Sequence, residues 1–314
     1  MNYKCKNPVL IIAFNRPDLF KKVLDRVIKV SPKKIYVSID GPRTNNFNQD
    51  LNSINEIISI IKKITNIKIK LLKNKFNLGV GRAPHKAISS CFKEEKKMII
   101  LEDDCLPSLS FFKFMDDLLA YYEDKKEIFH ITGSNILMNS KYINYSYDFS
   151  QICQTHGWAT WRDRWSNYIF EITDESLFHK KPSFLYSKFL YSKHAKYWHL
   201  LFKNILIEKK YNFWDYQLAY LMFKQGLFCI IPKINMIANL GNDFRSSNTK
   251  EKFSPTSELK LTSKNIFPLV HPKKIRRNHF LDAKIMDREY TISIFRRIIY
   301  KFMNFFYANN KKNI

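Results

Sequence analysis

Three adjacent acidic residues, Glu102, Asp103 and Asp104, directly follow an apolar run at residues 98–101. An uninterrupted apolar run of this length is typical of a central strand that is covered on both faces. Neighbouring carboxylates repel one another, and a hard divalent cation such as Mn²⁺ or Mg²⁺ relieves that repulsion and can bind a diphosphate on its other side. The triplet therefore indicates either a metal–diphosphate site or a solvated acidic turn, and the rest of the chain must decide.

The elements around the triplet predict its place in the fold. Short apolar runs that favour strands alternate here with amphipathic segments that favour helices. Strands are predicted at 9–14, 35–39, 67–72 and 128–131, and helices begin near residues 18, 51, 84 and 111. This alternation predicts an α/β fold with a mostly parallel central sheet flanked by helices.

Polar residues follow the end of each predicted strand. Right-handed crossovers bring all strand-end loops to one edge of a parallel sheet, which is where open α/β sheets bind ligands. We therefore expect Asn15-Arg16, Asp40-Gly41, residues 79–82 and the acidic triplet to line one cleft. The chain lacks a P-loop, and Gly79-Val80-Gly81 lacks the third glycine of a dinucleotide-binding fingerprint.

The expected cleft suits a nucleoside diphosphate. Asp40 can accept hydrogen bonds from a base or a ribose. Arg16 and Arg82 can pair with phosphate or ribose oxygens, and His85 is the alternative to Arg82.

The second half of the chain is rich in aromatic residues. Trp158, Trp161 and Trp165 have the spacing of one helix face, so they form either core or a wall that stacks on sugar rings. Trp214-Asp215 opens another predicted helix. Asp215 is therefore either a helix cap or a general base held beside an aromatic ring. Residues 242–265 are polar and are predicted to form a mobile loop.

The composition of the chain leaves more classes of function open than the motifs do. The chain has 314 residues and a formal net charge of +25, which fits nucleic acid, an anionic membrane surface or phosphate-bearing substrates. Lysine is spread along the chain, so charge alone names no partner. The five cysteines lie far apart and form no CxxC pair, which favours a reducing compartment. No apolar run approaches the roughly 20 residues of a membrane span.

The C-terminal segment predicts a basic amphipathic helix at residues 290–307. Its apolar positions are Ile292, Phe295, Ile299, Phe302 and Phe306, and Arg296, Arg297, Tyr300, Lys301 and Asn304 occupy another face. Such a helix docks on an anionic membrane surface, packs on the domain or forms a dimer contact, and we favour the membrane. We expect this tail to occupy residues 286–314.

Six motifs occur in order along the chain: Ala13-Phe14-Asn15-Arg16-Pro17, Ser38-Ile39-Asp40-Gly41-Pro42-Arg43, Asn77-Leu78-Gly79, Leu101-Glu102-Asp103-Asp104, Gly157-Trp158-Ala159-Thr160-Trp161 and Trp214-Asp215-Tyr216. Together they resemble GT-A glycosyltransferases, and most closely the bacterial group similar to animal N-acetylglucosaminyltransferase I. The resemblance runs from about residue 8 to about residue 249. It implies a nucleotide-sugar-binding half at 1–135 and an acceptor-binding and catalytic half of the same domain at 136–285.

The resemblance implies roles for the nucleotide and metal side of the site. Arg16 and Asp40 would contact the nucleoside and its phosphate. Asp104 would be the direct Mn²⁺ ligand, and Asp103 and Glu102 would hold the ribose and the donor sugar.

The resemblance also implies the catalytic side. Trp158 and Trp214 would belong to the donor-binding site, and Asp215 would be the base that deprotonates the acceptor hydroxyl, which makes the enzyme inverting. Many GT-A enzymes supply a late histidine to the metal. The corresponding segment 240–249 has none: Asn248 stands near the expected place, and His271 lies further on.

The sequence thus predicts a metal-dependent inverting glycosyltransferase that uses Mn²⁺ or Mg²⁺ and a nucleotide sugar, with a UDP-sugar favoured. The expected acceptor is a glycan or lipid-linked glycan in surface polysaccharide synthesis. The expected location is the inner face of the cell membrane, on the cytoplasmic side, with no nucleic-acid partner. The first alternative is a nucleotidyltransferase on a related fold, for which Asn15-Arg16-Pro17 is a poor phosphate loop. The second is a nucleic-acid-binding protein, which only the charge favours.

Overall fold

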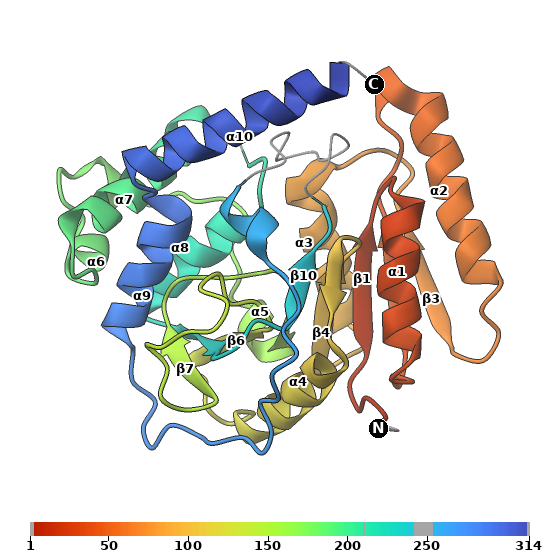
Figure 1. Ribbon diagram of the computed structural model, residues 1–314, viewed down its shortest axis with the longest axis horizontal. Helices are drawn as coiled ribbons and strands as arrows, with labels where there is room; N and C mark the ends of the chain where they lie inside the picture. Colours follow the sequence, from red (N-terminus) through yellow and green to blue (C-terminus); the bar gives the residue numbers. More distant parts are fainter. Residues whose placement is uncertain (1–2, 210, 242–253, 313–314) are drawn as a thin grey trace.

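The computed structural model describes residues 3–209, 211–241 and 254–312. An eight-stranded sheet runs through the molecule in the order β3-β2-β1-β4-β8-β6-β9-β7 (Figure 1). Its strands are β1 (Val9–Ala13), β2 (Ile35–Ile39), β3 (Ile69–Lys73), β4 (Lys97–Glu102), β6 (Ile128–Thr132), β7 (Tyr147–Ser150), β8 (Trp158–Trp161) and β9 (Phe228–Pro232). A second, two-stranded sheet pairs β5 (Cys105–Pro107) with β10 (Ile237–Asn239).

Most neighbouring strands of the large sheet are parallel. β3, β2, β1 and β4 run in one direction, and β6 and β9 also pair in parallel. β8 lies antiparallel between β4 and β6, and β7 is antiparallel at the edge. The predicted α/β class with a mostly parallel central sheet is confirmed, and the two halves of the chain share one sheet.

Helices cover both faces of this sheet. They are α1 (Pro17–Ile28), α2 (Phe47–Lys62), α3 (Gly79–Phe92), α4 (Leu109–Tyr121), α5 (Arg162–Trp165), α6 (Ser183–Tyr186), α7 (Ser192–Glu208), α8 (Asp215–Gln225), α9 (His279–Ile285) and α10 (Ile294–Lys312). Short turns occur at η1 (Thr44–Asn46), η2 (Glu175–Phe178) and η3 (Pro255–Glu258), and η4 (Met286–Tyr290) is a π-helical turn.

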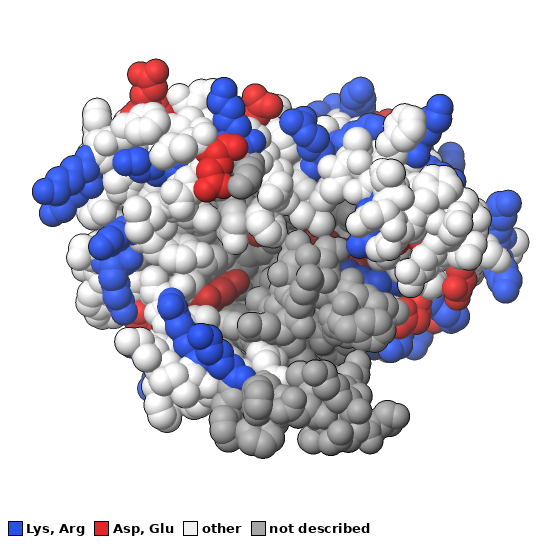
Figure 2. Space-filling view, turned by 90° about the horizontal axis from the view of Figure 1, so that it is seen from above, with Lys and Arg blue, Asp and Glu red and all other residues white. Residues whose placement is uncertain are grey.

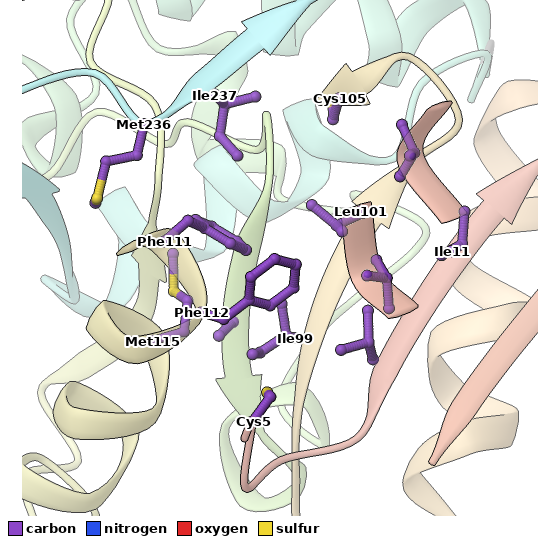
Figure 3. Close-up of a cluster of buried hydrophobic side chains, with 14 of the residues drawn as sticks. Cys5, Ile11, Ile99, Leu101, Cys105, Phe111, Phe112, Met115, Met236 and Ile237 are labelled. Atoms are coloured by element: carbon purple, nitrogen blue, oxygen red, sulfur yellow. The ribbon is translucent and has the colours of Figure 1, made fainter. Parts of the chain in front are cut away.

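Two buried clusters lie on opposite faces of the sheet, because successive strand side chains point to opposite sides. On β1, Val9 and Ile11 belong to one cluster and Leu10 to the other. Figure 3 shows the first cluster, in which Ile99 and Leu101 of β4 lie beside the rings of Phe111 and Phe112 from α4. Each such fully buried side chain stabilises the fold by about 1.5–3 kcal/mol. The acidic triplet therefore begins at the end of β4, where the strand leaves this buried apolar cluster.

Two predicted elements differ in the structure. The third helix begins at Gly79 and not at Pro84, because the Asp40 carboxylate accepts hydrogen bonds from the backbone N–H groups of Leu78 and Gly79 at its start. Trp158 and Trp161 lie on a strand and not on a helix face. Residues three apart on a strand point to opposite faces of the sheet, so Trp158 and Trp161 join different core clusters.

The remaining expectations concern the late segments. Of the predicted mobile loop at 242–265, residues 242–253, including Asn248, lie outside the described residues. All five cysteines are free and buried. No helix within the described part of the chain has the length and apolar character needed to cross a membrane.

Candidate functional site

A cavity of about 390 Å³ lies at the end of the sheet where β1, β2 and β4 terminate. The strand-end segments predicted to converge do line it: Asn15 and Arg16 after β1, Asp40 after β2, and Glu102 to Asp104 at the end of β4. Trp214 and Asp215 line it from the start of α8. Residues that are far apart in the sequence therefore form one site.

Arg16 and the acidic triplet form an ion-pair network at the floor of this cavity. The Arg16 guanidinium contacts Asp103 through Nη2 and lies 2.9 Å from Oδ2 of Asp104. Asp103 also accepts a hydrogen bond from the backbone N–H of Phe14, at 3.3 Å. Arg16 thus orders the two aspartates and does not point freely toward a ligand.

The triplet carries more negative charge than Arg16 can balance. Burial, together with the charges of Asp104, Asp103 and Asp215, raises the pKa of Glu102 to about 8, and the Arg16 charge opposes the rise. Burial also raises the pKa of Asp103, and the Arg16 charge opposes that rise. A divalent cation at this position would offset the excess charge.

Asp104 fits a metal site that is completed by the substrate. No group of three His, Cys, Asp or Glu side chains in the described parts of the chain is arranged to hold a metal ion. The Asp104 carboxylate nevertheless faces the cavity and remains 16% exposed. The carboxylate oxygens of Asp104 fit a hard cation that would also bind diphosphate oxygens.

The late segment reaches the triplet through the small sheet. β10 pairs with β5, so the backbone N–H of Leu240 donates to the carbonyl oxygen of Asp104 at 2.9 Å. Gly241 then packs against the Asp104 carboxylate. Segment 240–241 lies beside Asp104, as the resemblance implied, and the rest of the predicted ligand loop lies outside the described residues.

Asp40 organises the neighbouring loop. Its carboxylate accepts hydrogen bonds from the side-chain amides of Asn74 and Asn77 and from the backbone N–H groups of Gly41, Leu78 and Gly79, at 2.9–3.1 Å. Asp40 lines the cavity but is buried and occupied by these contacts. In this structure its carboxylate shapes one wall of the cavity.

Asp215 is the first residue of α8, and it faces the cavity. Its carboxylate accepts a hydrogen bond from the backbone N–H of Tyr216 at 3.1 Å. Burial raises the pKa of Asp215 to about 6, although backbone hydrogen bonds oppose the rise. Trp214 is the N-cap residue of α8, so Asp215 lies in the first turn, where its carboxylate satisfies one backbone N–H. Its proton affinity suits a general base near neutral pH.

One of the predicted tryptophans lines the cavity, and the others are buried in the core. Trp214 lines the cavity, and its ring stacks on that of Trp158 with centroids 5.3 Å apart. Trp158 is buried behind it and is not part of the cavity lining. Trp161 donates to the carbonyl oxygen of Leu119, and Trp165 donates to Ser89. Trp158 therefore supports the site from behind.

Three predicted candidates lie elsewhere. Arg82 is exposed, 3.9 Å from Glu171, and its guanidinium lies over the Phe170 ring. His85 stacks on Phe170 with centroids 5.1 Å apart. Neither belongs to the cavity lining. His271 donates to or accepts from Tyr147 on a different face of the molecule, so it is not near Asp104.

Two cavity residues were missed by sequence reasoning. Arg43 lines the cavity near Asp40, and Asp50 holds its guanidinium at 2.8 Å. His156 lines the cavity close enough to Asp104 that the aspartate charge acts on its pKa, which burial lowers. Both stand within or next to quoted motifs, since Arg43 ends the Asp40 motif and His156 precedes Gly157. The histidine near Asp104 thus comes from the loop before β8.

No protein-family model matches this chain, and no curated protein matches its sequence. Among solved structures, the chain aligns with 4-diphosphocytidyl-2C-methyl-D-erythritol synthase from Anaerococcus prevotii at 14% identity, covering 55% of this chain and 80% of that one, with a TM-score of 0.33. It also aligns with an apo UDP-glucose pyrophosphorylase at 9% identity, covering 75% and 93%, with a TM-score of 0.37. An inositol-1-phosphate CTP transferase from T. maritima aligns at 12% identity, covering 52% and 74%, with a TM-score of 0.29. Likenesses this distant carry no argument about the reaction.

Proposed function

We propose that this protein is an enzyme that acts on a nucleotide sugar. More specifically, we infer an inverting, metal-dependent glycosyltransferase of the GT-A type that moves a sugar from a UDP-sugar to a hydroxyl group of a glycan. The observation that carries this proposal is the position of Asp215. It faces the same cavity as the Glu102–Asp104 triplet, so a base and a diphosphate-binding end share one site.

The residues can carry out the transfer in one displacement. Asp215 accepts the proton of the acceptor hydroxyl, and the acceptor oxygen attacks the anomeric carbon from the face opposite the nucleotide. The bond between the anomeric carbon and the diphosphate oxygen breaks, and its electron pair leaves with the nucleoside diphosphate. When bound at Asp104, Mn²⁺ or Mg²⁺ supplies Lewis-acid stabilisation of that leaving group. Arg16 holds Asp104 and Asp103 in place for this task.

The charges of the cavity favour this reaction over nucleotidyl transfer. A nucleotidyltransferase brings an anionic acceptor phosphate to the α-phosphate of a nucleoside triphosphate and needs free cations for both. Here Arg16 is paired with Asp103 and Asp104, and Arg43 is paired with Asp50. Asp215 adds negative charge where the acceptor would lie. A neutral hydroxyl acceptor suits this cavity better than a phosphate.

The positive charge on one face of the molecule gives no support to nucleic-acid binding. On the face seen from above in Figure 2, the described Lys and Arg side chains lie mainly around the periphery and form no continuous basic track. Nucleic-acid-binding proteins concentrate such residues in a stripe or patch.

A ligand screen tests the proposal. We expect nucleotide sugars to raise the unfolding temperature by a few degrees in the presence of Mn²⁺ and not in the presence of EDTA, because a ligand at 100 times its Kd stabilises the native state by about 2.7 kcal/mol. The Asp104→Ala variant should lose this response. Stabilisation by a nucleoside triphosphate plus a sugar 1-phosphate, with none by nucleotide sugars, would support nucleotidyl transfer instead.

We further propose that α10 docks the enzyme on an anionic membrane at the cytoplasmic face, where a lipid-linked glycan acceptor for surface polysaccharide synthesis would be presented. Among the described side chains of this helix, five apolar ones are exposed: Ile294 (77%), Phe295 (74%), Ile298 (59%), Ile299 (39%) and Met303 (39%). Arg297 and Lys301 are exposed on the same helix. Exposed apolar residues with flanking cations match the chemistry of an anionic bilayer surface.

The orientation of α10 supports this docking. Tyr300 is buried and donates to Glu258, so it faces the protein, whereas the sequence placed it on the polar face. The Phe302 and Phe306 side chains lie outside the described residues. α10 lies on the side of the molecule toward which β1 and β4 point, so the helix and the cavity share one end (Figure 1). A membrane at this helix would lie near the acceptor entrance.

A further inference from the structure

The π-helical turn η4 directs three consecutive charged side chains to three different partners. Asp287 accepts from Lys193 at 2.6 Å and lies 3.0 Å from His194 on α7. Arg288 donates to Glu258, the last residue of η3. Glu289 accepts a hydrogen bond from the Gln154 side chain at 2.5 Å. The contacts of Asp287 and Arg288 hold the turn in place. π-helical turns occur frequently at functional sites.

Gln154 links Glu289 to the cavity. It directly precedes Thr155 and His156, which line the cavity together with Asp215. Its amide oxygen accepts from the Ser134 hydroxyl at 3.4 Å, so its NH₂ group is turned toward Glu289. Glu289 lies behind the residues that line the cavity. Within the described residues, its Oε2 atom accepts the hydrogen bond from Gln154, and its Oε1 atom has no protein donor.

Glu289 also lies within the electrostatic reach of Asp215. Burial and the Asp215 charge together raise the pKa of Glu289 to about 8, and the Gln154 hydrogen bond opposes the rise. The carboxyl group is therefore largely protonated at neutral pH and can donate one hydrogen bond as well as accept others. A protonated carboxyl group can therefore form both kinds of hydrogen bond with a sugar hydroxyl.

Partly exposed tyrosines surround the two acids. Tyr197, Tyr216 and Tyr290 each have a pKa that burial raises and that the charges of Asp215 and Glu289 raise further, so both acids are near all three hydroxyl groups. The Tyr197 and Tyr290 rings lie 5.7 Å apart. Carboxyl groups next to exposed aromatic rings suit a saccharide, whose hydroxyls hydrogen-bond and whose C–H faces pack on rings.

We propose that Glu289 is an acceptor-binding residue, whose carboxyl group holds one hydroxyl of a neutral saccharide acceptor while Asp215 deprotonates another. The inference rests on the proposed function, because it assigns the base to Asp215. It adds the acceptor class, since two acids at one end of the site favour a saccharide without phosphate or carboxylate groups. It also implies that the segment leading into α10 completes the acceptor side.

Binding of simple glycosides tests this assignment. The probes are octyl β-D-glucoside, octyl β-D-galactoside and octyl N-acetyl-β-D-glucosaminide, each below its micelle-forming concentration and each with UDP and Mn²⁺ present. Saturation-transfer NMR should detect at least one of them on the wild-type protein. Glu289→Ala should weaken that glycoside at least tenfold and leave the UDP affinity unchanged, and Glu289→Gln should recover part of the loss.

Asp287→Asn is the matched control, because it removes the neighbouring acid that faces α7. It should leave glycoside affinity unchanged. Unchanged glycoside affinity in Glu289→Ala, an equal loss in Asp287→Asn, or the absence of binding of all three glycosides to the wild-type protein would each overturn the assignment while Mn²⁺-dependent nucleotide-sugar binding persists. Failure of the wild-type protein to bind any nucleotide sugar would instead overturn the proposed function, and this inference with it.

Discussion

Gly241 lies so close to Asp104 that no side chain fits between them. A Cβ atom at this position would lie 2.0 Å from Oδ2 of Asp104 and 2.9 Å from Nη1 of Arg16. We therefore expect Gly241→Ala to displace the Asp104 carboxylate and to weaken Mn²⁺-dependent UDP binding at least tenfold in calorimetry. Overpacking of this kind costs about 1–3 kcal/mol, so the unfolding temperature should fall modestly. An unchanged UDP affinity would show that Asp104 does not hold the metal.

Asp215 should lower stability while it supports catalysis. Burial raises its pKa from the ordinary value of 3.8 to about 6, so Asp215 has a higher proton affinity in the folded state than in the unfolded state. Above about pH 6 the ionised group therefore destabilises the fold, by about 3 kcal/mol at most. Asp215→Asn should abolish transfer, retain UDP binding and raise the unfolding temperature at pH 7.5, with no rise at pH 3.5. Substantial residual turnover would make Asp215 a helix cap only.

The same carboxylate sets the acid limb of the pH profile. Transfer needs the ionised base, so kcat/KM should fall tenfold per unit as the pH drops below about 6. The measurement uses saturating donor, with the acceptor concentration varied. A limb near pH 4 would indicate an unburied carboxylate and would contradict the structure.

At the scale of elements, the first half of the sheet could be predicted because its signals are local. The strands before Asn15 and Asp40 are short apolar runs followed by turn residues, and the structure has them within a residue or two of the predicted positions. The segment Trp158–Trp161 is different. Its three-residue spacing fits a helix face locally, and antiparallel pairing with β4 and β6 decides for a strand. Such distant pairing leaves no local pattern in the sequence.

The helix α10 offers a test of membrane docking with a matched control. Phe295 is 74% exposed on α10, and Phe280 is 67% exposed on α9. Phe295→Ser combined with Ile298→Ser should release the protein from vesicles of phosphatidylglycerol and phosphatidylcholine in a flotation assay, because each exposed apolar side chain loses about 1.5–3 kcal/mol of burial. The Phe280→Ser protein should remain bound to the vesicles to the same extent as the wild-type protein. Equal flotation of all variants would exclude α10 as the docking element.

At the scale of the whole molecule, the sequence predicted the edge of the sheet at which the cavity lies. It did not predict all of the side chains that line the cavity. Asn15, Arg16, Asp40 and the acidic triplet meet there because parallel strands end together. Arg82 follows the same rule and yet turns away toward Glu171 and Phe170. The direction of a side chain depends on neighbours supplied by distant segments. His156 enters the site for the same reason, from a loop without a strand-end signal.

The net charge of +25 and the exposed face of α10 should contribute separately to membrane binding. Attraction of the whole molecule to anionic lipid is screened by salt, because the Debye length falls from about 10 Å at 0.1 M to about 3 Å at 1 M. Insertion of apolar side chains is not screened in this way. Wild-type protein should therefore keep part of its vesicle binding at 0.5 M NaCl, whereas Phe295→Ser/Ile298→Ser protein should lose all of it. Co-sedimentation over a salt series measures both components. Complete release of the wild-type protein by 0.5 M NaCl would mean that charge alone holds it at the surface, and α10 would then be free to contact a protein partner.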